Sequence, residues 1–296
     1  MTNFLQYAAT GLAGGFATAL LALGVVMIYR STRVLSFVQG AIASLATYVY
    51  YQLGTAWSWP AWVALPLAIV AAIAIGFLVD LLAMRPLRRA DALTRTVATL
   101  GVFLVILAII RVVWHGGETF VHPLSTSIAR IGTFSLSVQQ IITGIVAVAA
   151  SVALVWWTRR TYTGLGLSAM AEDPSAARLL GVSPGRTSSL TWMVSAVLAA
   201  LAGILVTPLL VLNPFQMTLL MVTSYAAALL GGFISLPLTL IGAVLVGAGE
   251  SLTTGYVNVS GLSETFGFIA VFAILLISRG RGGAAAPSLG NGSESW

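Results

Sequence analysis

The chain has 296 residues, of which 58% are hydrophobic and only 7% are charged, and its mean hydropathy is +0.99. A soluble domain carries roughly 25% charged residues, so this chain has too few to cover a water-facing surface, and we predict that lipid surrounds most of it. The net charge of +6 comes from fourteen Arg, with no Lys, against eight acids. Cysteine is absent, which excludes disulfides, thiolate nucleophiles and Cys-based metal sites.

A membrane-spanning helix needs about 20 apolar residues, so the length allows roughly eight to ten spans with short loops. Apolar runs between Arg-, Pro- or Gly-containing breaks predict nine spans, which are Ala8–Tyr29, Ser36–Leu53, Ala61–Met84, Thr96–Trp114, Val138–Thr158, Ser189–Leu210, Gln216–Phe233, Leu236–Thr254 and Thr265–Ser278. The second, seventh and last are short or begin without a clear polar break. The predicted fold class is therefore all-α, a polytopic transmembrane helical bundle.

The predicted domain organisation is simple. We expect residues 1–280 to form one transmembrane domain with a long cytoplasmic loop at 159–188. Residues 281–296 are rich in Gly, Ala and Ser, and we expect a disordered tail there. No basic residue precedes the first apolar run, so we expect a retained span and not a signal peptide.

The arginines predict the orientation, because basic residues collect on cytoplasmic loops. With the N-terminus outside, only Arg111 and Arg130 fall on the outer side, and the other twelve share the inner side. These twelve are Arg30, Arg33, Arg85, Arg88, Arg89, Arg95, Arg159, Arg160, Arg178, Arg186, Arg279 and Arg281. The bias predicts a multi-pass protein of the bacterial plasma (inner) membrane, with the N-terminus outside and the C-terminus in the cytoplasm.

The long cytoplasmic loop contains a short helix with its own start and stop signals. Asp173 is a good N-cap, Pro174 suits the first helical position, and Gly181 fits a left-handed residue after the last turn. Leu179 and Leu180 offer an apolar knob. An isolated two-turn helix is marginal in water, so the spans or a docked partner must hold it. A connecting helix that lies along the membrane surface is the alternative.

Several motifs match a known family in order along the chain. They are ALLALG at 19–24, SFVQG at 36–40, RPLR at 85–88, LTRTVATLG at 93–101, TGLGL at 163–167, the loop helix, LAG at 201–203, and AAALLGG with SLP between 226 and 237. On these motifs the chain up to about Arg281 resembles the branched-chain amino acid permeases of ABC importers (the LivH/LivM type). The family commonly has Asn where this chain has Ser36, a difference in a segment that bears on solute preference.

The resemblance implies a role for the loop helix. In such permeases it is the coupling helix, which sits in a groove of the ATPase subunit. The residues carried over to this role are Glu172, Asp173, Pro174, Ala176, Ala177, Arg178, Leu179, Gly181 and Val182.

The resemblance also implies a function and partners. The chain is expected to be a permease subunit that moves branched-chain amino acids or a similar small polar solute into the cytoplasm. The implied partners are cytoplasmic ATPase subunits, a homologous permease or a second copy of the chain, and an extracytoplasmic solute-binding protein, with no nucleic acid and no cofactor. A phosphate-binding P-loop needs a Lys, and the chain has none, so we expect ATP hydrolysis on another polypeptide. A self-sufficient secondary transporter or channel for a small solute such as urea is the alternative.

Polar and ionisable side chains within spans are candidates for a solute path, because they are costly in lipid. Hydrogen bonding between helices explains such residues equally well. The polar candidates are Gln39, Asn213, Tyr225 and Glu250, and Phe37 and Gly40 flank Gln39 in the second span.

Other ionisable residues predict structure and not chemistry. Asp80 lies one turn before Arg85, and we interpret it as the structural partner of that arginine and not as a proton relay. His115, Glu118 and His122 have the spacing of one helical face, but two glycines interrupt it, so we predict no metal site. The sequence shows no paired carboxylates and no nucleophile–base set that would indicate catalysis.

Overall fold

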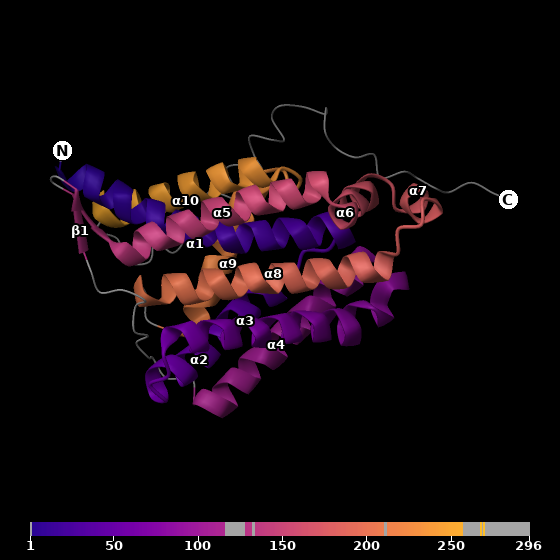
Figure 1. Cartoon of the computed structure of the whole chain (residues 1–296), viewed down its shortest axis with the longest axis horizontal. Helices are drawn as coiled ribbons and strands as arrows, with labels where there is room; N and C mark the ends of the chain where they lie inside the picture. Colours follow the sequence, from indigo (N-terminus) through magenta and orange to yellow (C-terminus); the bar gives the residue numbers. More distant parts are fainter. Residues whose placement is uncertain are drawn as a thin grey trace.

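The computed structural model describes residues 2–115, 128–131, 134–209, 212–256, 267 and 269. Long helices lie side by side along the longest axis of the molecule (Figure 1). In chain order they are α1 (Thr2–Thr32), α2 (Val38–Tyr51), α3 (Ala61–Val79), α4 (Ala92–Trp114), α5 (Val138–Arg160), α6 (Tyr162–Glu172), α7 (Pro174–Leu179), α8 (Pro184–Val206), α9 (Pro214–Leu230) and α10 (Leu236–Tyr256).

Shorter elements extend or join these helices. The π-helical segments Gln52–Ala56 and Asp80–Met84 continue α2 and α3, and 3-10 turns form at Pro86–Arg89 and Thr207–Leu209. An antiparallel hairpin of β1 (Ile128–Ile131) and β2 (Phe134–Ser137) precedes α5. The sequence predicts an external loop between Trp114 and Val138, and this hairpin forms part of that segment.

Among the described residues, six segments are long and apolar enough to cross a bilayer, and they are Gly11–Thr32, Ala61–Met84, Ala92–Trp114, Val138–Arg160, Pro184–Val206 and Leu236–Tyr256. They confirm a polytopic helical membrane bundle. The second and seventh predicted spans correspond to α2, which has 14 residues before its π-helical extension, and to α9, whose apolar part is Met217–Leu230. The ninth predicted span and the predicted tail lie outside the described residues, apart from Gly267 and Ile269.

Helix α1 forms the centre of the bundle. In its most apolar window 83% of the residues are buried, against 22% in that of α4. Small residues allow this burial, because they let helix backbones approach closely. A Cβ on Gly247 of α10 would lie only 2.4 Å from the Cα of Gly15 in α1, and a Cβ on Gly203 of α8 would lie 2.6 Å from the carbonyl oxygen of Ala43 in α2.

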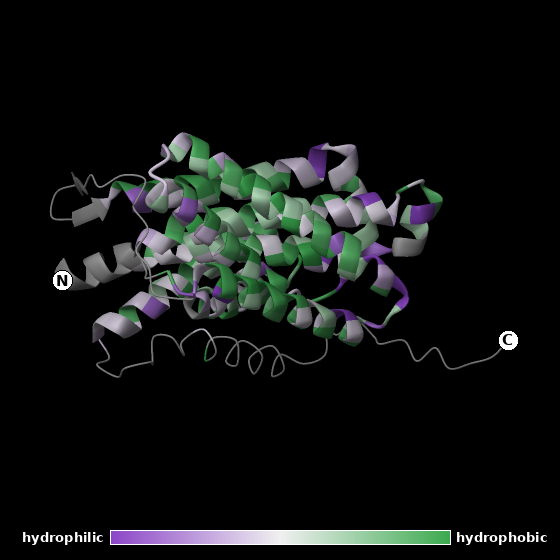
Figure 2. Cartoon of the chain, turned by 90° about the horizontal axis from the view of Figure 1, so that it is seen from below, coloured by the Kyte–Doolittle hydropathy of each residue, from purple (hydrophilic) through white to green (hydrophobic). Residues whose placement is uncertain are grey.

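The arginines collect at one end of the bundle, which we call the arginine end. Here α1, α3 and α5 finish and α4 and α8 begin, and hydrophilic residues gather beyond a hydrophobic middle (Figures 1 and 2). The described arginines at this end are Arg30, Arg33, Arg85, Arg88, Arg89, Arg95, Arg159, Arg160, Arg178 and Arg186. Arg111 and Arg130 lie at the opposite end, in α4 and β1. The grouping predicted from the sequence is therefore present, with Arg279 and Arg281 outside the described residues.

The segment between residues 159 and 188 contains α7, the short helix that the sequence predicts, and a further helix, α6, that it does not. Helix α6 starts directly after α5, and α8 starts five residues before the predicted span. Thr161 caps α6, because its Oγ1 accepts a hydrogen bond from the Gly164 N–H at 3.1 Å. A Cβ on Gly164 would lie 2.1 Å from the Trp157 carbonyl oxygen, so only glycine permits this sharp turn. Because glycine has low helix propensity, Gly164 and Gly166 weaken the sequence signal for a helix at α6.

Candidate functional site

At the arginine end α6 connects α5 to α7, and α7 extends beyond the long helices (Figure 1). Two arginines at the end of α1 hold α6 in place, Arg30 in its last turn and Arg33 directly after it. Nη2 of Arg30 donates to Oγ of Ser168 at 3.1 Å, and Nη2 of Arg33 donates to the carbonyl oxygen of Ala171. The central helix of the bundle is thus joined directly to α6.

Helix α7 has the start and stop that the sequence predicts. It begins at Pro174, and Oδ1 of Asp173 accepts a hydrogen bond from the Ala176 N–H at 3.2 Å. At its end Gly181 has φ of +83°, and the Val182 N–H donates to the Ala177 carbonyl oxygen at 3.0 Å. This is the glycine-terminated stop that satisfies the last carbonyl groups of a helix. The predicted caps are confirmed.

One face of α7 is anchored and the other is open to solvent. Ala177 is 1% exposed, whereas Leu179 is 90% exposed and Leu180 is 81% exposed. Val182 packs on α6, because a Cβ on Gly166 would lie 3.3 Å from its Cγ1. Two leucines this exposed on a water-facing projection form an apolar knob that lacks a cover among the described residues. Such a knob is typical of a surface that a partner covers.

Four of the six predicted path residues lie in one region, where the start of α2 faces α9. The rings of Phe37 and Tyr225 have centroids 5.6 Å apart. Gly40 lies against α9, since a Cβ there would be 3.1 Å from the sulfur of Met221. Gln39 points toward α1, because its Oε1 would be 3.6 Å from a Cβ on Gly24.

The chain between α1 and α2 is non-helical, and alternate residues of it are buried in the bundle. The Phe37 N–H donates to Oγ1 of Thr99 at 3.2 Å, and Thr99 is seven residues, roughly 10 Å, into α4. Val34 is 1% exposed and Ser36 is 0% exposed. Irregular backbone inside a membrane protein is tolerated where protein buries it or where it lines a water-filled cavity. The sequence predicts a break here, between Tyr29 and Ser36, but not its contact with α4.

Several buried polar atoms in and around α2 and α9 lack hydrogen-bond partners among the described residues. Both amide atoms of Gln39 and the hydroxyl of Tyr225 are in this state, as are the hydroxyls of Ser36, Ser44 and Tyr48. Most buried polar groups in proteins are hydrogen-bonded, and each exception requires an explanation. Water or a polar solute would supply the missing partners.

The other two path candidates lie elsewhere. Asn213 directly precedes α9, and Glu250 lies in the second half of α10, so both are toward the end opposite the arginines. Each has an interaction partner. The structure does not bring them together with Phe37, Gln39 and Tyr225.

The pairing predicted for Asp80 is present. Nε of Arg85 lies 3.2 Å from Oδ2 of Asp80, which is completely buried. Two further donors were not predicted, the hydroxyls of Ser188 and Ser189 at the start of α8, at 2.6 Å and 2.5 Å. No sequence signal could have found them, because more than 100 residues separate them from Asp80.

The described part of the chain contains no group of three or more His, Cys, Asp or Glu residues placed to hold a metal ion. His115 ends α4 with a left-handed backbone. The other two residues of that predicted spacing, Glu118 and His122, lie outside the described residues.

Comparison with known proteins gives a consistent result. Residues 7–278 match the family described as "Branched-chain amino acid transport system / permease component". The chain is 28% identical over 288 residues to the "High-affinity branched-chain amino acid transport system permease protein LivH" of Salmonella typhimurium, covering 93% of this chain and 92% of that protein. It is 28% identical over 257 residues to the "Probable branched-chain amino acid transport permease protein LivH" of Methanocaldococcus jannaschii, covering 84% and 79%.

Among solved structures, the chain resembles one in "PsaBC from Streptococcus pneumoniae in complex with Fab". The TM-score is 0.51 at 15% identity, over 93% of this chain and 90% of that one. This likeness shows a shared fold.

Proposed function

The chain belongs to the family of branched-chain amino acid transport system permease components, and from this premise we propose that it is the membrane-spanning subunit of an ATP-driven importer. The proposed solute is a branched-chain amino acid or a similar small polar molecule, as the names of the relatives suggest. The observation that carries the ATP-driven part of the proposal is α7, a capped helix with an exposed apolar knob.

We propose that α7 is the point where a separate ATPase pushes on the permease. A short helix transmits force only if its ends are fixed, and the N-cap at Asp173 and the stop at Gly181 supply this. Leu179 and Leu180 are the surface that a groove on the ATPase would cover. The absence of Lys supports hydrolysis on another chain, because a P-loop requires one.

The orientation follows from the positive-inside rule. Ten described arginines at one end favour a cytoplasmic location for that end, which is where an ATPase could reach α7. The start of α1 would then lie at the outer face, and Arg279 and Arg281 favour a cytoplasmic C-terminus. An outer solute-binding protein and a second permease, homologous or identical, complete the proposed assembly.

The proposed solute path runs beside the break between α1 and α2. Gln39 and Tyr225 offer buried polar atoms without partners among the described residues, and a zwitterionic solute needs such groups in place of water. Phe37 and Gly40 shape the same region. Asn213 and Glu250 would serve only nearer the outer face.

The test uses proteoliposomes that contain the chain, its ATPase subunits and its solute-binding protein. Arg178→Glu and Gly181→Pro should keep membrane insertion but uncouple ATP hydrolysis from uptake. Proline cannot adopt the φ of +83° found at Gly181. Arg89→Glu, a change of another exposed arginine at the same end, should leave uptake at the wild-type rate. Wild-type uptake by both α7 variants, or flux through the chain without any ATPase, would overturn the proposal.

A further inference from the structure

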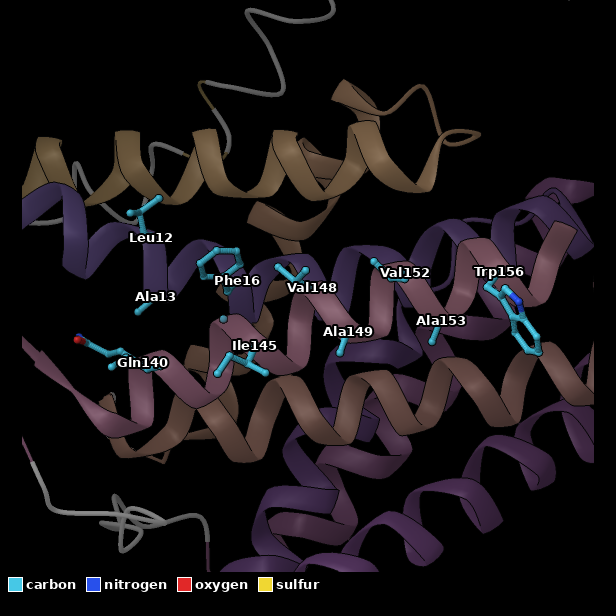
Figure 3. A pocket seen from close by; sticks show the side chains of 12 residues that line it. Leu12, Ala13, Phe16, Gln140, Ile145, Val148, Ala149, Val152, Ala153 and Trp156 are labelled. Carbon is cyan, nitrogen blue, oxygen red and sulfur yellow. The ribbon is translucent and has the colours of Figure 1, made fainter. Parts of the chain in front are cut away.

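An apolar groove of about 900 Å³ follows the outer face of α5 beside α1 (Figure 3). Leu12 and Phe16 of α1 and Ile145 and Val148 of α5 contribute to its lining. Figure 3 shows Trp156 at one end of this row of side chains, the end nearer the arginines. The groove therefore runs along most of a membrane-spanning helix.

A second hollow, of about 490 Å³, continues the first toward the arginine end. The two share Val152 and Trp156, and Pro237 and Leu240 of α10 also line the second. Arg159 and Arg160 also line it. The two hollows thus form one apolar groove, which ends at two adjacent arginines.

These two arginines are not used by the described part of the protein. Both are exposed, and neither forms a hydrogen bond or an ion pair with a described residue. The acids that follow these arginines most closely in the sequence have other partners, because Glu172 interacts electrostatically with Arg30 and Asp173 caps α7. The mouth of the hollow therefore carries an uncompensated positive charge at the membrane surface.

The dimensions match one leaflet of a bilayer. From Val148 to Arg159 is eleven residues along α5, which is roughly 16 Å of helix. Half of a hydrocarbon core is about 15 Å thick. A fatty acyl chain that lies along α5 would therefore place its headgroup level with the arginines.

We propose that this double groove binds one anionic phospholipid from the leaflet at the arginine end. The phosphate lies between Arg159 and Arg160, whose planar guanidinium groups suit phosphate oxygens. An acyl chain lies over Val152 and Val148, and Trp156 sits at the interface, where tryptophan is enriched. Basic pockets between transmembrane helices are a recognised setting for anionic headgroups.

A lipid fits these features better than a second copy of the chain does. A two-fold contact through this face would bring the arginine pairs of both copies into one interface, where like charges oppose association. A lipid supplies the missing negative charge and fills both hollows at once. The site is independent of the transport proposal, because its occupancy is measured without solute or ATP.

The test measures quenching of Trp156 by brominated lipids in bilayers that contain the full chain. Subtracting the signal of Trp156→Phe isolates this residue from the other tryptophans. Brominated phosphatidylglycerol should quench Trp156 at a mole fraction roughly tenfold lower than brominated phosphatidylcholine, because each arginine near the surface adds to anionic lipid binding.

Two kinds of variant separate charge from shape. Arg159→Gln with Arg160→Gln should abolish the preference, whereas Arg88→Gln with Arg89→Gln, the other adjacent arginine pair at this end, should keep it. Val152→Phe fills the groove without adding a tryptophan, and it should abolish the preference while the charge remains.

Three results would overturn the proposal. They are equal quenching by both lipids, an equal loss in the two arginine-pair variants, and protection of Trp156 from every lipid, which would indicate a protein partner or a second copy on this face. Native mass spectrometry of the same variants gives an independent count of retained phosphatidylglycerol, and its result should follow the quenching.

Discussion

The buried carboxylate of Asp80 fastens the end of α3 to the start of α8. It accepts hydrogen bonds from Ser188, Ser189 and Arg85 at 2.6, 2.5 and 3.2 Å. Helix α8 follows α7 after only a few residues, so this contact fixes one root of the projecting segment. We predict that Asp80→Ala destabilises the protein more than removal of any exposed carboxylate.

The size of the effect can be worked from the contacts. Removing one partner of a buried ion pair typically costs about 3–5 kcal/mol. Here Ser189 has another acceptor, the carbonyl oxygen of Gly185 at 2.9 Å, and the Arg85 side chain is 38% exposed and can reach water. Both reduce the penalty, so we expect roughly 3 kcal/mol for Asp80→Ala. Asp80→Asn keeps the shape and one acceptor, and should cost roughly half of this.

The assay is reversible unfolding of the purified chain in mixed micelles, followed by tryptophan fluorescence. Asp91→Ala is the control, because Asp91 is an exposed carboxylate that caps α4; the hydrogen bonds from Thr94 lower its pKa. If Asp80→Ala unfolds with the wild-type free energy, or loses less than Asp91→Ala, the view of Asp80 as a fastening between helices is refuted.

Two further predictions test packing and the path. Gly247→Leu should lower the free energy of unfolding by about 1–3 kcal/mol through overpacking against α1. Gly14→Ala, where a Cβ meets nothing within 4 Å, should be neutral or stabilising. Equal melting temperatures for the two variants would contradict this prediction. Gln39→Leu should reduce solute uptake in proteoliposomes while the melting temperature stays the same or rises, because it removes buried amide atoms that lack partners among the described residues. Unchanged uptake would show that Gln39 does not line the path.

The parts of the fold that the sequence predicted well have local signals. The third span was predicted at Ala61–Met84 and occupies these residues, because Pro60 precedes it and an arginine follows it. The ends of α7 were predicted because Asp173 and Gly181 act on the backbone within a few residues of themselves. Hydrophobic length and capping are properties of the segment alone.

The parts that were missed depend on distant residues. Helix α6 contains two glycines, and it is held by α1 through Arg30 and by the turn after Trp157. The irregular backbone between α1 and α2 is held against α4 because Thr99 forms hydrogen bonds with Leu35 and Phe37. Ser188 looks like any serine at a helix start until Asp80 is placed beside it. A pattern read along the chain has no access to such neighbours.

Helix α1 connects α7, the proposed contact with the ATPase, to the proposed solute path. Arg30 and Arg33 tie the end of α1 to α6, on which Ala177 and Val182 seat α7. Farther along α1, Gly24 lies against Gln39 at the start of α2. A force on the exposed leucines of α7 would therefore pass into a helix that is buried over most of its length and cannot bend into lipid. Close packing transmits such displacements and does not absorb them, so the region of Gln39 is where movement of α7 should be felt.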